Sequence, residues 1–120
     1  MRSLRFLAAV FFTLAWYKSG FAQPLSEKDL RDFRGGVYTG CFNGQRSRDV
    51  NRFASDAQIR LYCSCFTQSL ANSSTTIQDV QRALEMRKRS EEAMLNHLLK
   101  GRDLYTVANQ CANDAIRGAR

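Results

Sequence analysis

The chain has 120 residues, of which 44% are hydrophobic and 24% are charged, and its formal net charge is +7. This length is enough for one compact domain. The sequence shows no internal repeat, no low-complexity block and no second domain, which excludes a repeat architecture.

The first 22 residues have the layout of a secretory signal peptide. Arg2 and Arg5 precede an apolar core over residues 6–16, and small residues follow at Gly20 and Ala22. The apolar core is well short of the roughly 20 residues that a membrane-spanning helix needs. We therefore predict cleavage and export, with no membrane span in the mature chain.

The mature chain, residues 23–120, is expected to be a single exported domain, periplasmic or secreted. Cleavage removes three of the 18 basic residues and none of the 11 acidic ones, so the formal charge falls from +7 to +4. A chain of this size buries too little surface to be very stable without help. Its four cysteines predict a disulfide framework, which supplies that help.

The mature part begins with a predicted helix, and the spacing of apolar residues near 3.6 throughout predicts an all-α fold. Ser26, with Asp29 three residues later, is typical of a helix start. One apolar stripe follows, at Leu30, Phe33, Val37 and Cys41.

Three glycines interrupt this stripe, at Gly35, Gly36 and Gly40. Each weakens a helix by roughly 1 kcal/mol, so we expect either a local break or, preferably, a neighbouring backbone packed closely against them. Asn43-Gly44 then predicts a turn. A charged surface connection follows, from which Val50 and Phe53 are expected to reach the core.

Ser55 or Asp56 can cap a second helix. Its apolar face contains Ile59, Tyr62, Cys63, Phe66 and Leu70. After a loop at 71–76, Thr76 and Asp79 predict the start of another helix. Its apolar residues are Ile77, Val80, Ala83 and Leu84.

The polar stretch 85–92 predicts a break or bend near Ser90. The next apolar patch consists of Met94, Leu95, Leu98 and Leu99. Gly101 suits a helix end, and Asp103 can cap a last helix. That helix carries Leu104, Val107, Cys111 and Ala115, and the tail at 116–120 is expected to fray. We thus predict a small bundle of four to five helices.

Cys63 and Cys65 are the most informative residues of the chain. Residues two apart on a helix are separated by about 200° around its axis, so these two cysteines project toward nearly opposite sides and cannot bridge each other. Each can reach a different neighbour, Cys41 or Cys111. The helix that carries them is therefore predicted to be fastened on both sides. Both remaining pairings are open, and we slightly favour Cys41 with Cys65 and Cys63 with Cys111.

The order Phe33, Cys41, Tyr62-Cys63-x-Cys65 and a late Cys111 resembles a class of small exported bacterial helical proteins with a Tyr-Cys-x-Cys signature. Most members of that class have no assigned function. The resemblance covers about residues 30 to 111. It implies a disulfide-bonded helical bundle in the periplasm, with no catalytic residues to transfer. The pair Gly35-Gly36 departs from what the class leads us to expect.

A few residues of the chain are candidates for a metal site or an enzyme site. Thiolates together with Met86, Met94 and His97 could bind copper(I) or zinc, but the cysteine spacing is unlike zinc sites and His97 is alone. Met94 is better explained as a core residue and His97 as a partly exposed helix residue. A hydrolase would need a nucleophile and base that the sequence does not provide. We predict no metal, no cofactor and no catalytic residue.

A thiol oxidoreductase commonly carries Cys-x-x-Cys at a helix start after a strand. This chain has Cys-x-Cys in the middle of a helix instead. An enzyme assembled from scattered residues would have to draw on Tyr38, Tyr62, His97 and Tyr105.

Basic clusters at 87–89 and at Arg46, Arg48 and Arg52 could suggest nucleic acid or membranes as partners. Both lie beside acidic residues, so neither forms a field of one sign, and a solvated face explains them better. We expect no nucleic-acid partner. The preferred function is a non-catalytic binding protein whose partner is another envelope protein or a small ligand. The alternatives are an immunity or inhibitor protein against an envelope-directed toxin and a thiol-redox component.

Overall fold

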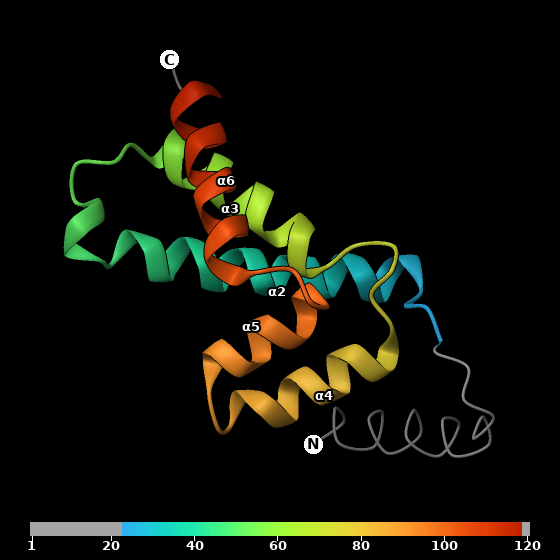
Figure 1. Cartoon of the computed structure of the whole chain (residues 1–120). Helices are drawn as coiled ribbons and strands as arrows, with labels where there is room; N and C mark the ends of the chain where they lie inside the picture. Colours follow the sequence, from blue (N-terminus) through green and yellow to red (C-terminus); the bar gives the residue numbers. More distant parts are fainter. Residues whose placement is uncertain (1–22, 119–120) are drawn as a thin grey trace, which may run out of the picture.

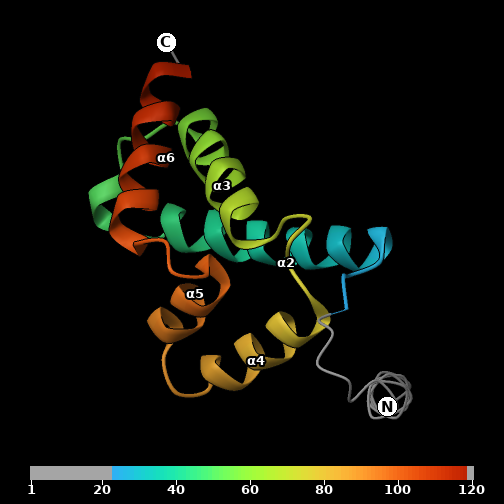
Figure 2. The ribbon, with the colours of Figure 1, turned by 45° about the vertical axis from the view of Figure 1, so that its right-hand side comes forward.

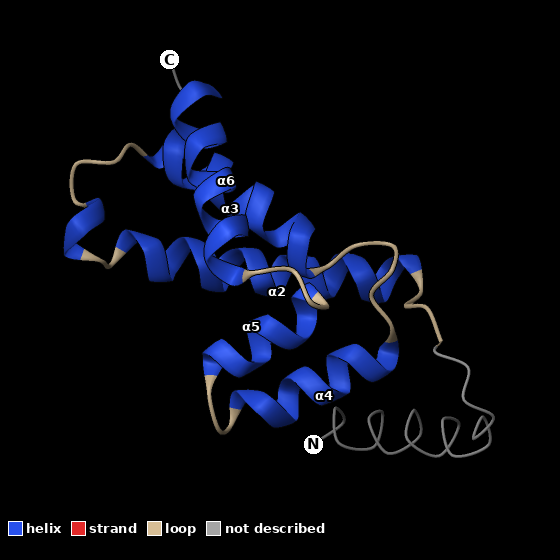
Figure 3. Cartoon of the chain, in the orientation of Figure 1, coloured by secondary structure: helices blue, strands red, loops and turns tan. Residues whose placement is uncertain are grey.

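The computed structural model describes residues 23–118, and the predicted signal peptide at 1–22 lies outside them. The described part is all-α, as predicted (Figure 3). Five α-helices and one 3₁₀ helix follow in order: α2 (Glu27–Arg46), η1 (Asp49–Asn51), α3 (Asp56–Leu70), α4 (Ile77–Arg87), α5 (Glu91–Leu99) and α6 (Leu104–Gly118). A single β-bridge joins Pro24 to Thr76.

The helices begin where capping chemistry predicts. Ser26 accepts a hydrogen bond from the Asp29 amide, and Ser55 and Thr76 each form a full capping box with the residue three positions later. The predicted break near Ser90 is confirmed, because Ser90 caps α5 after α4 has ended. Asp103 accepts a hydrogen bond from the Thr106 amide at the start of α6. Such caps satisfy amide donors that the first turn of a helix leaves unpaired.

The helices form two groups in space (Figure 1). Helix α3 packs between α2 and α6, while α4 and α5 form an antiparallel hairpin that lies on the other side of α2 in the view of Figure 1. The view turned by 45° shows the same arrangement (Figure 2). The hairpin contacts the rest of the fold mainly through α5, which touches both α3 and α6.

The core lies where the second half of α3, helix α5 and the first half of α6 meet. Its buried members are Phe66, Leu70, Ala83, Leu98, Leu99, Val107 and Cys111. Helix α2 has no fully buried residue and contributes Phe33 and Val37 from its edge. No helix within residues 23–118 is both long enough and apolar enough to span a bilayer.

Helix α2 corrects two predictions. It runs unbroken through Gly35, Gly36 and Gly40, and no atom lies within 4 Å of a Cβ placed on any of them, so the expected close packing is wrong. It also continues through Asn43-Gly44 to Arg46, so the expected turn is wrong. A glycine weakens a helix without preventing it, and the packing of Phe33 and Val37 together with the bond from Cys41 holds α2 in place.

Two other segments also differ from expectation, the connection around η1 and the end of α6. Val50 and Phe53 are 79% and 90% exposed, so they do not reach the core. They lie in the short connection around η1, and both side chains face solvent. Helix α6 continues through Ile116 to Gly118, so the expected fraying is wrong for these residues, and residues 119–120 lie outside the described part.

Candidate functional site

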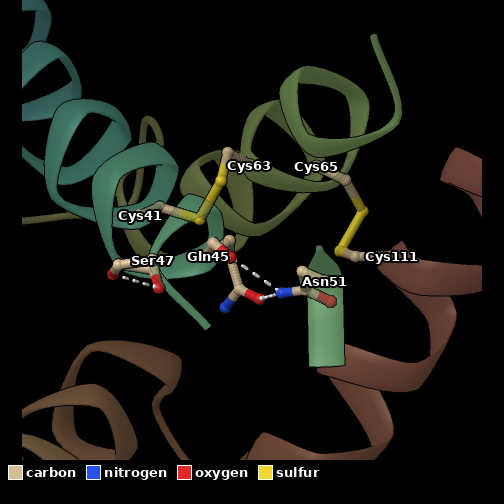
Figure 4. The surroundings of a disulfide bond; sticks show 8 residues. Cys41, Gln45, Ser47, Asn51, Cys63, Cys65 and Cys111 are labelled. Carbon is tan, nitrogen blue, oxygen red and sulfur yellow. Dashed lines mark hydrogen bonds between the residues drawn. A yellow bond between two sulfur atoms is a disulfide. The ribbon is translucent and has the colours of Figure 1, made fainter. Parts of the chain in front are cut away.

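The four predicted disulfide residues are all paired, and α3 is fastened on both sides as predicted. Cys63 bonds to Cys41 of α2, and Cys65 bonds to Cys111 of α6 (Figure 4). The Cα atoms of the two pairs are 5.7 Å and 5.5 Å apart, within the usual range. Cys63 and Cys111 are almost completely buried. No free thiol is left as a nucleophile or metal ligand.

The pairing that we slightly favoured, Cys41 with Cys65 and Cys63 with Cys111, is wrong. Cys63 lies on the α3 stripe that includes Ile59 and Phe66, and α2 covers the Cys63 side, whereas α6 covers the Cys65 side. Helical geometry requires the two thiols to diverge. It does not state which neighbour lies on which side.

Beside these bridges the molecule has an open groove of about 350 Å³. This volume is at the lower end of the range of small-molecule sites. We define the groove by its lining, which comes from the end of α2, the η1 connection, the first half of α3 and residues 108–116 of α6. Its apolar lining is Ala54, Ile59, Ala108, Ala112, Ala115 and Ile116. Its polar lining is Gln45, Arg48, Asn51, Gln58, Tyr62 and Asn109.

Arg46 holds the wall of the groove that the η1 connection forms. Its guanidinium donates to the carbonyl oxygens of Asn51 at 2.7 Å and Ala54 at 3.0 Å, and it pairs with the Asp56 carboxylate at 2.9 Å. The Asn51 amide adds hydrogen bonds to the backbone oxygen and side-chain oxygen of Gln45 (Figure 4). The planar fork of an arginine suits several acceptors at once, so one side chain fixes the whole connection.

Tyr62 and Arg48 give the groove its polar chemistry. The Tyr62 ring stacks on Phe66, with centroids 5.7 Å apart. Burial raises the pKa of the Tyr62 hydroxyl, and the positive charge of Arg48 offsets only part of that rise. Tyr62 therefore stays protonated at neutral pH and can donate a hydrogen bond. Within residues 23–118, neither the Tyr62 hydroxyl nor the Arg48 guanidinium has a hydrogen-bond or ion-pair partner.

The residues considered for an enzyme do not gather in this groove. Of the four, only Tyr62 lines it. Tyr38 stacks on Phe42 along α2, and Tyr105 is 66% exposed on α6. His97 lines a separate hollow between α4 and α5. Within the described chain, no group of three or more His, Cys, Asp or Glu side chains is placed to hold a metal ion.

The hollow at His97 belongs to a cluster that ties the hairpin together. The Asp79 carboxylate forms an ion pair with the Lys100 ammonium, with Oδ2 and Nζ 2.8 Å apart. Its other oxygen, Oδ1, lies 3.7 Å from Nε2 of His97. Burial by itself would raise the pKa of the Asp79 carboxyl, but the hydrogen bonds from Lys100 and Thr76 outweigh it and lower the pKa below its ordinary value of 3.8. Asp79 therefore has two structural roles. It belongs to the capping box at the start of α4, and it forms the ion pair with Lys100.

Comparison of the chain with protein-family models, with curated proteins and with solved structures gives no match. The resemblance to exported proteins with a Tyr-Cys-x-Cys signature therefore stays a prediction. The groove itself was not predicted. Its amide residues show no periodicity that marks them, and Arg48 was grouped with Arg46 and Arg52 as part of a solvated face. Only the hydrogen bonds of Arg46 reveal that these three arginines have different surroundings.

Proposed function

We propose that the mature chain is a non-catalytic, exported binding protein of the periplasm, and that the groove is its binding surface. The observation that carries this proposal is the position of the groove. It is formed by the three helices that the two disulfides join, so its walls are fixed before any partner arrives. A preformed surface loses less entropy on binding, which favours affinity.

Export is supported by two features. Disulfides persist in oxidising compartments and are rare in the cytosol, and all four cysteines here are paired in two bridges. The signal-like residues 1–22 point the same way. The absence of catalysis is proposed because Tyr38, Tyr62, His97 and Tyr105 are dispersed and the cysteines are paired.

Affinity capture from the envelope fraction of the source organism tests the binding surface. The mature protein is compared with Ala112→Arg, which places a long charged side chain in the groove. Asn113→Arg is the matched control, because Asn113 neighbours Ala112 and is exposed outside the groove. We expect one envelope protein or ligand to be retained by the native protein and by Asn113→Arg, and lost with Ala112→Arg. Equal retention by all three proteins would show that the groove is not the binding surface.

Thiol trapping in intact cells tests the compartment and the non-redox role. Alkylation before lysis, followed by mass spectrometry, should find all four cysteines protected and residues 1–22 absent. A pair that is reduced in a sizeable fraction of molecules would argue for a thiol-redox component instead.

A further inference from the structure

The three arginines around η1 have different surroundings, and of the three only Arg48 lines the groove. Arg46 is bonded to Asn51, Ala54 and Asp56. Arg52 lies over the Phe53 ring, 5.0 Å from its centroid. Arg48 is the one charged residue in the groove lining, and within residues 23–118 its guanidinium has no partner. An unpaired cation among neutral groups favours an anionic ligand group.

Tyr62 adds a second donor in the same groove. Tyr62 and Arg48 line the same groove, and within residues 23–118 neither the hydroxyl nor the guanidinium has a hydrogen-bond or ion-pair partner. A guanidinium and a phenolic hydroxyl together match a carboxylate, because each oxygen of a carboxylate accepts a hydrogen bond and the charged contact strengthens both.

The rest of the lining indicates what carries that carboxylate. Four side-chain amides line the groove, at Gln45, Asn51, Gln58 and Asn109. Three of them are partly engaged, because Asn51 donates to the backbone and side-chain oxygens of Gln45, and the Gln58 side-chain oxygen accepts from the Ser55 amide. Within residues 23–118 the NH₂ groups of Gln45 and Gln58, the side-chain oxygen of Asn51 and the whole Asn109 amide are still available. These donors and acceptors can match the alternating N–H and C=O groups of a peptide backbone. The alanines of α6 in the lining leave room for a backbone to come close. A hydrocarbon chain would leave these remaining amide groups without partners, at a cost of about 1 to 3 kcal/mol for each group that is desolvated.

We propose that the groove binds an extended peptide segment of its partner through an acidic residue, whose carboxylate contacts Arg48 and Tyr62 while the amides bind the backbone. This inference rests on the proposed function and deepens it by naming the chemistry of the partner. It requires no covalent step and no metal.

Selection of displayed random peptides on the disulfide-intact mature protein provides the probe. We expect the selected peptides to share an aspartate or glutamate next to apolar residues. The best one, made with a fluorescent label, is measured by anisotropy against its isostere with Asn or Gln in place of the acid. The isostere should bind at least about tenfold more weakly. Failure to select peptides, or selection of peptides without a shared acid, would overturn the proposal.

Three variants locate the contact. Arg48→Gln should weaken binding at least about tenfold, and Tyr62→Phe, which keeps the stacking on Phe66, by several-fold. Arg60→Gln is the control, because Arg60 is exposed on α3 outside the groove and its loss changes the net charge equally. It should change affinity less than twofold. Equal losses for Arg48→Gln and Arg60→Gln would show that only overall charge matters and would overturn the assignment.

Two further outcomes separate this inference from the proposed function. If sodium octanoate displaces the labelled peptide at concentrations at which octanamide does not, and binds with comparable affinity, the natural ligand class is a small amphiphilic acid and the peptide assignment is wrong. If the captured partner is lost with Ala112→Arg yet retained by Arg48→Gln, the groove is the binding surface but does not recognise its partner through a carboxylate. Unchanged circular dichroism and melting of each variant exclude misfolding as the cause.

Discussion

Two regions of the molecule are held together by different forces. The disulfide-linked layer, formed by α2, α3 and α6, has one covalent bond between α2 and α3 and one between α3 and α6. The α4–α5 hairpin contains no cysteine. The buried side chains of Ala83, Leu98 and Leu99 anchor it to the core, and the contact between Lys100 and Asp79 holds its two helices to each other.

This difference shows what the disulfides make possible. Helix α2 has four glycines and no fully buried side chain, yet it spans 20 residues, and the bond from Cys41 keeps it on α3. The layer can therefore leave a groove with polar lining open to solvent. The hairpin has no such bond, so its place depends on tight burial and on well-capped helix ends.

Removal of a disulfide should give the largest loss of stability, and it should loosen the disulfide-linked layer first. Replacing Cys65 and Cys111 by alanine should lower the free energy of unfolding by roughly 4 kcal/mol, against roughly 3 kcal/mol for Cys41 and Cys63. The reason is the longer loop, since the pairs are separated by 46 and 22 residues. Guanidinium denaturation without reductant measures both. Transitions that match the native protein would contradict the view that the bridges hold the layer.

A leucine of α5 tests the burial that anchors the hairpin. Leu99 is fully buried, so Leu99→Ala should cost about 2 to 5 kcal/mol, through lost burial and the cavity left behind. Leu84→Ala is the matched control, because Leu84 is 51% exposed on α4, and it should cost well under half as much. The same denaturation experiment compares them. Similar costs would show that the hairpin is not held by its buried residues.

Asp79 tests the charged contact with Lys100 that holds α4 and α5 to each other. Because its pKa is lowered on folding, the stabilisation is fully present above the ordinary pKa of 3.8 and is lost as the pH falls through the lower folded value. Asp79→Asn should cost about 1 kcal/mol at neutral pH, as expected for a weakened cap. Melting followed from pH 7 into the acid range should then decline less in Asp79→Asn than in the native protein. Parallel declines would contradict this role.

The smallest expected effect is a gain in stability, obtained by replacing an exposed glycine of the disulfide-linked layer. Gly40→Ala should raise the free energy of unfolding by up to about 1 kcal/mol, because nothing lies within 4 Å of the added Cβ and alanine favours the helix. Gly101→Ala is the contrasting control. Gly101 has a φ of +87°, which alanine adopts poorly, so this change should lower stability. Thermal melting distinguishes the two signs, and a loss for Gly40→Ala would mean that α2 uses its glycines in a contact.

Local features of this chain were predictable, and features that depend on distant neighbours were not. The starts at Ser26, Ser55, Thr76 and Ser90 follow from a side chain and an amide within three residues of each other. The groove depends on where the η1 connection lies against α6, and the hydrogen bonds of Arg46 set that position. Nothing in the residues from 46 to 52 alone separates a structural arginine from a free one.

By itself, the sequence determined that residues 23–118 are helical, where the helices begin, and that Cys63 and Cys65 must bond to different helices, because helical periodicity and capping act over a few residues. The tertiary structure alone decided that Cys63 bonds to α2 and Cys65 to α6, and that Arg48, which has no partner within residues 23–118, lines the same groove as Tyr62. These outcomes depend on which side of α3 each neighbour covers, and that choice is made by the packing of residues far apart in the chain.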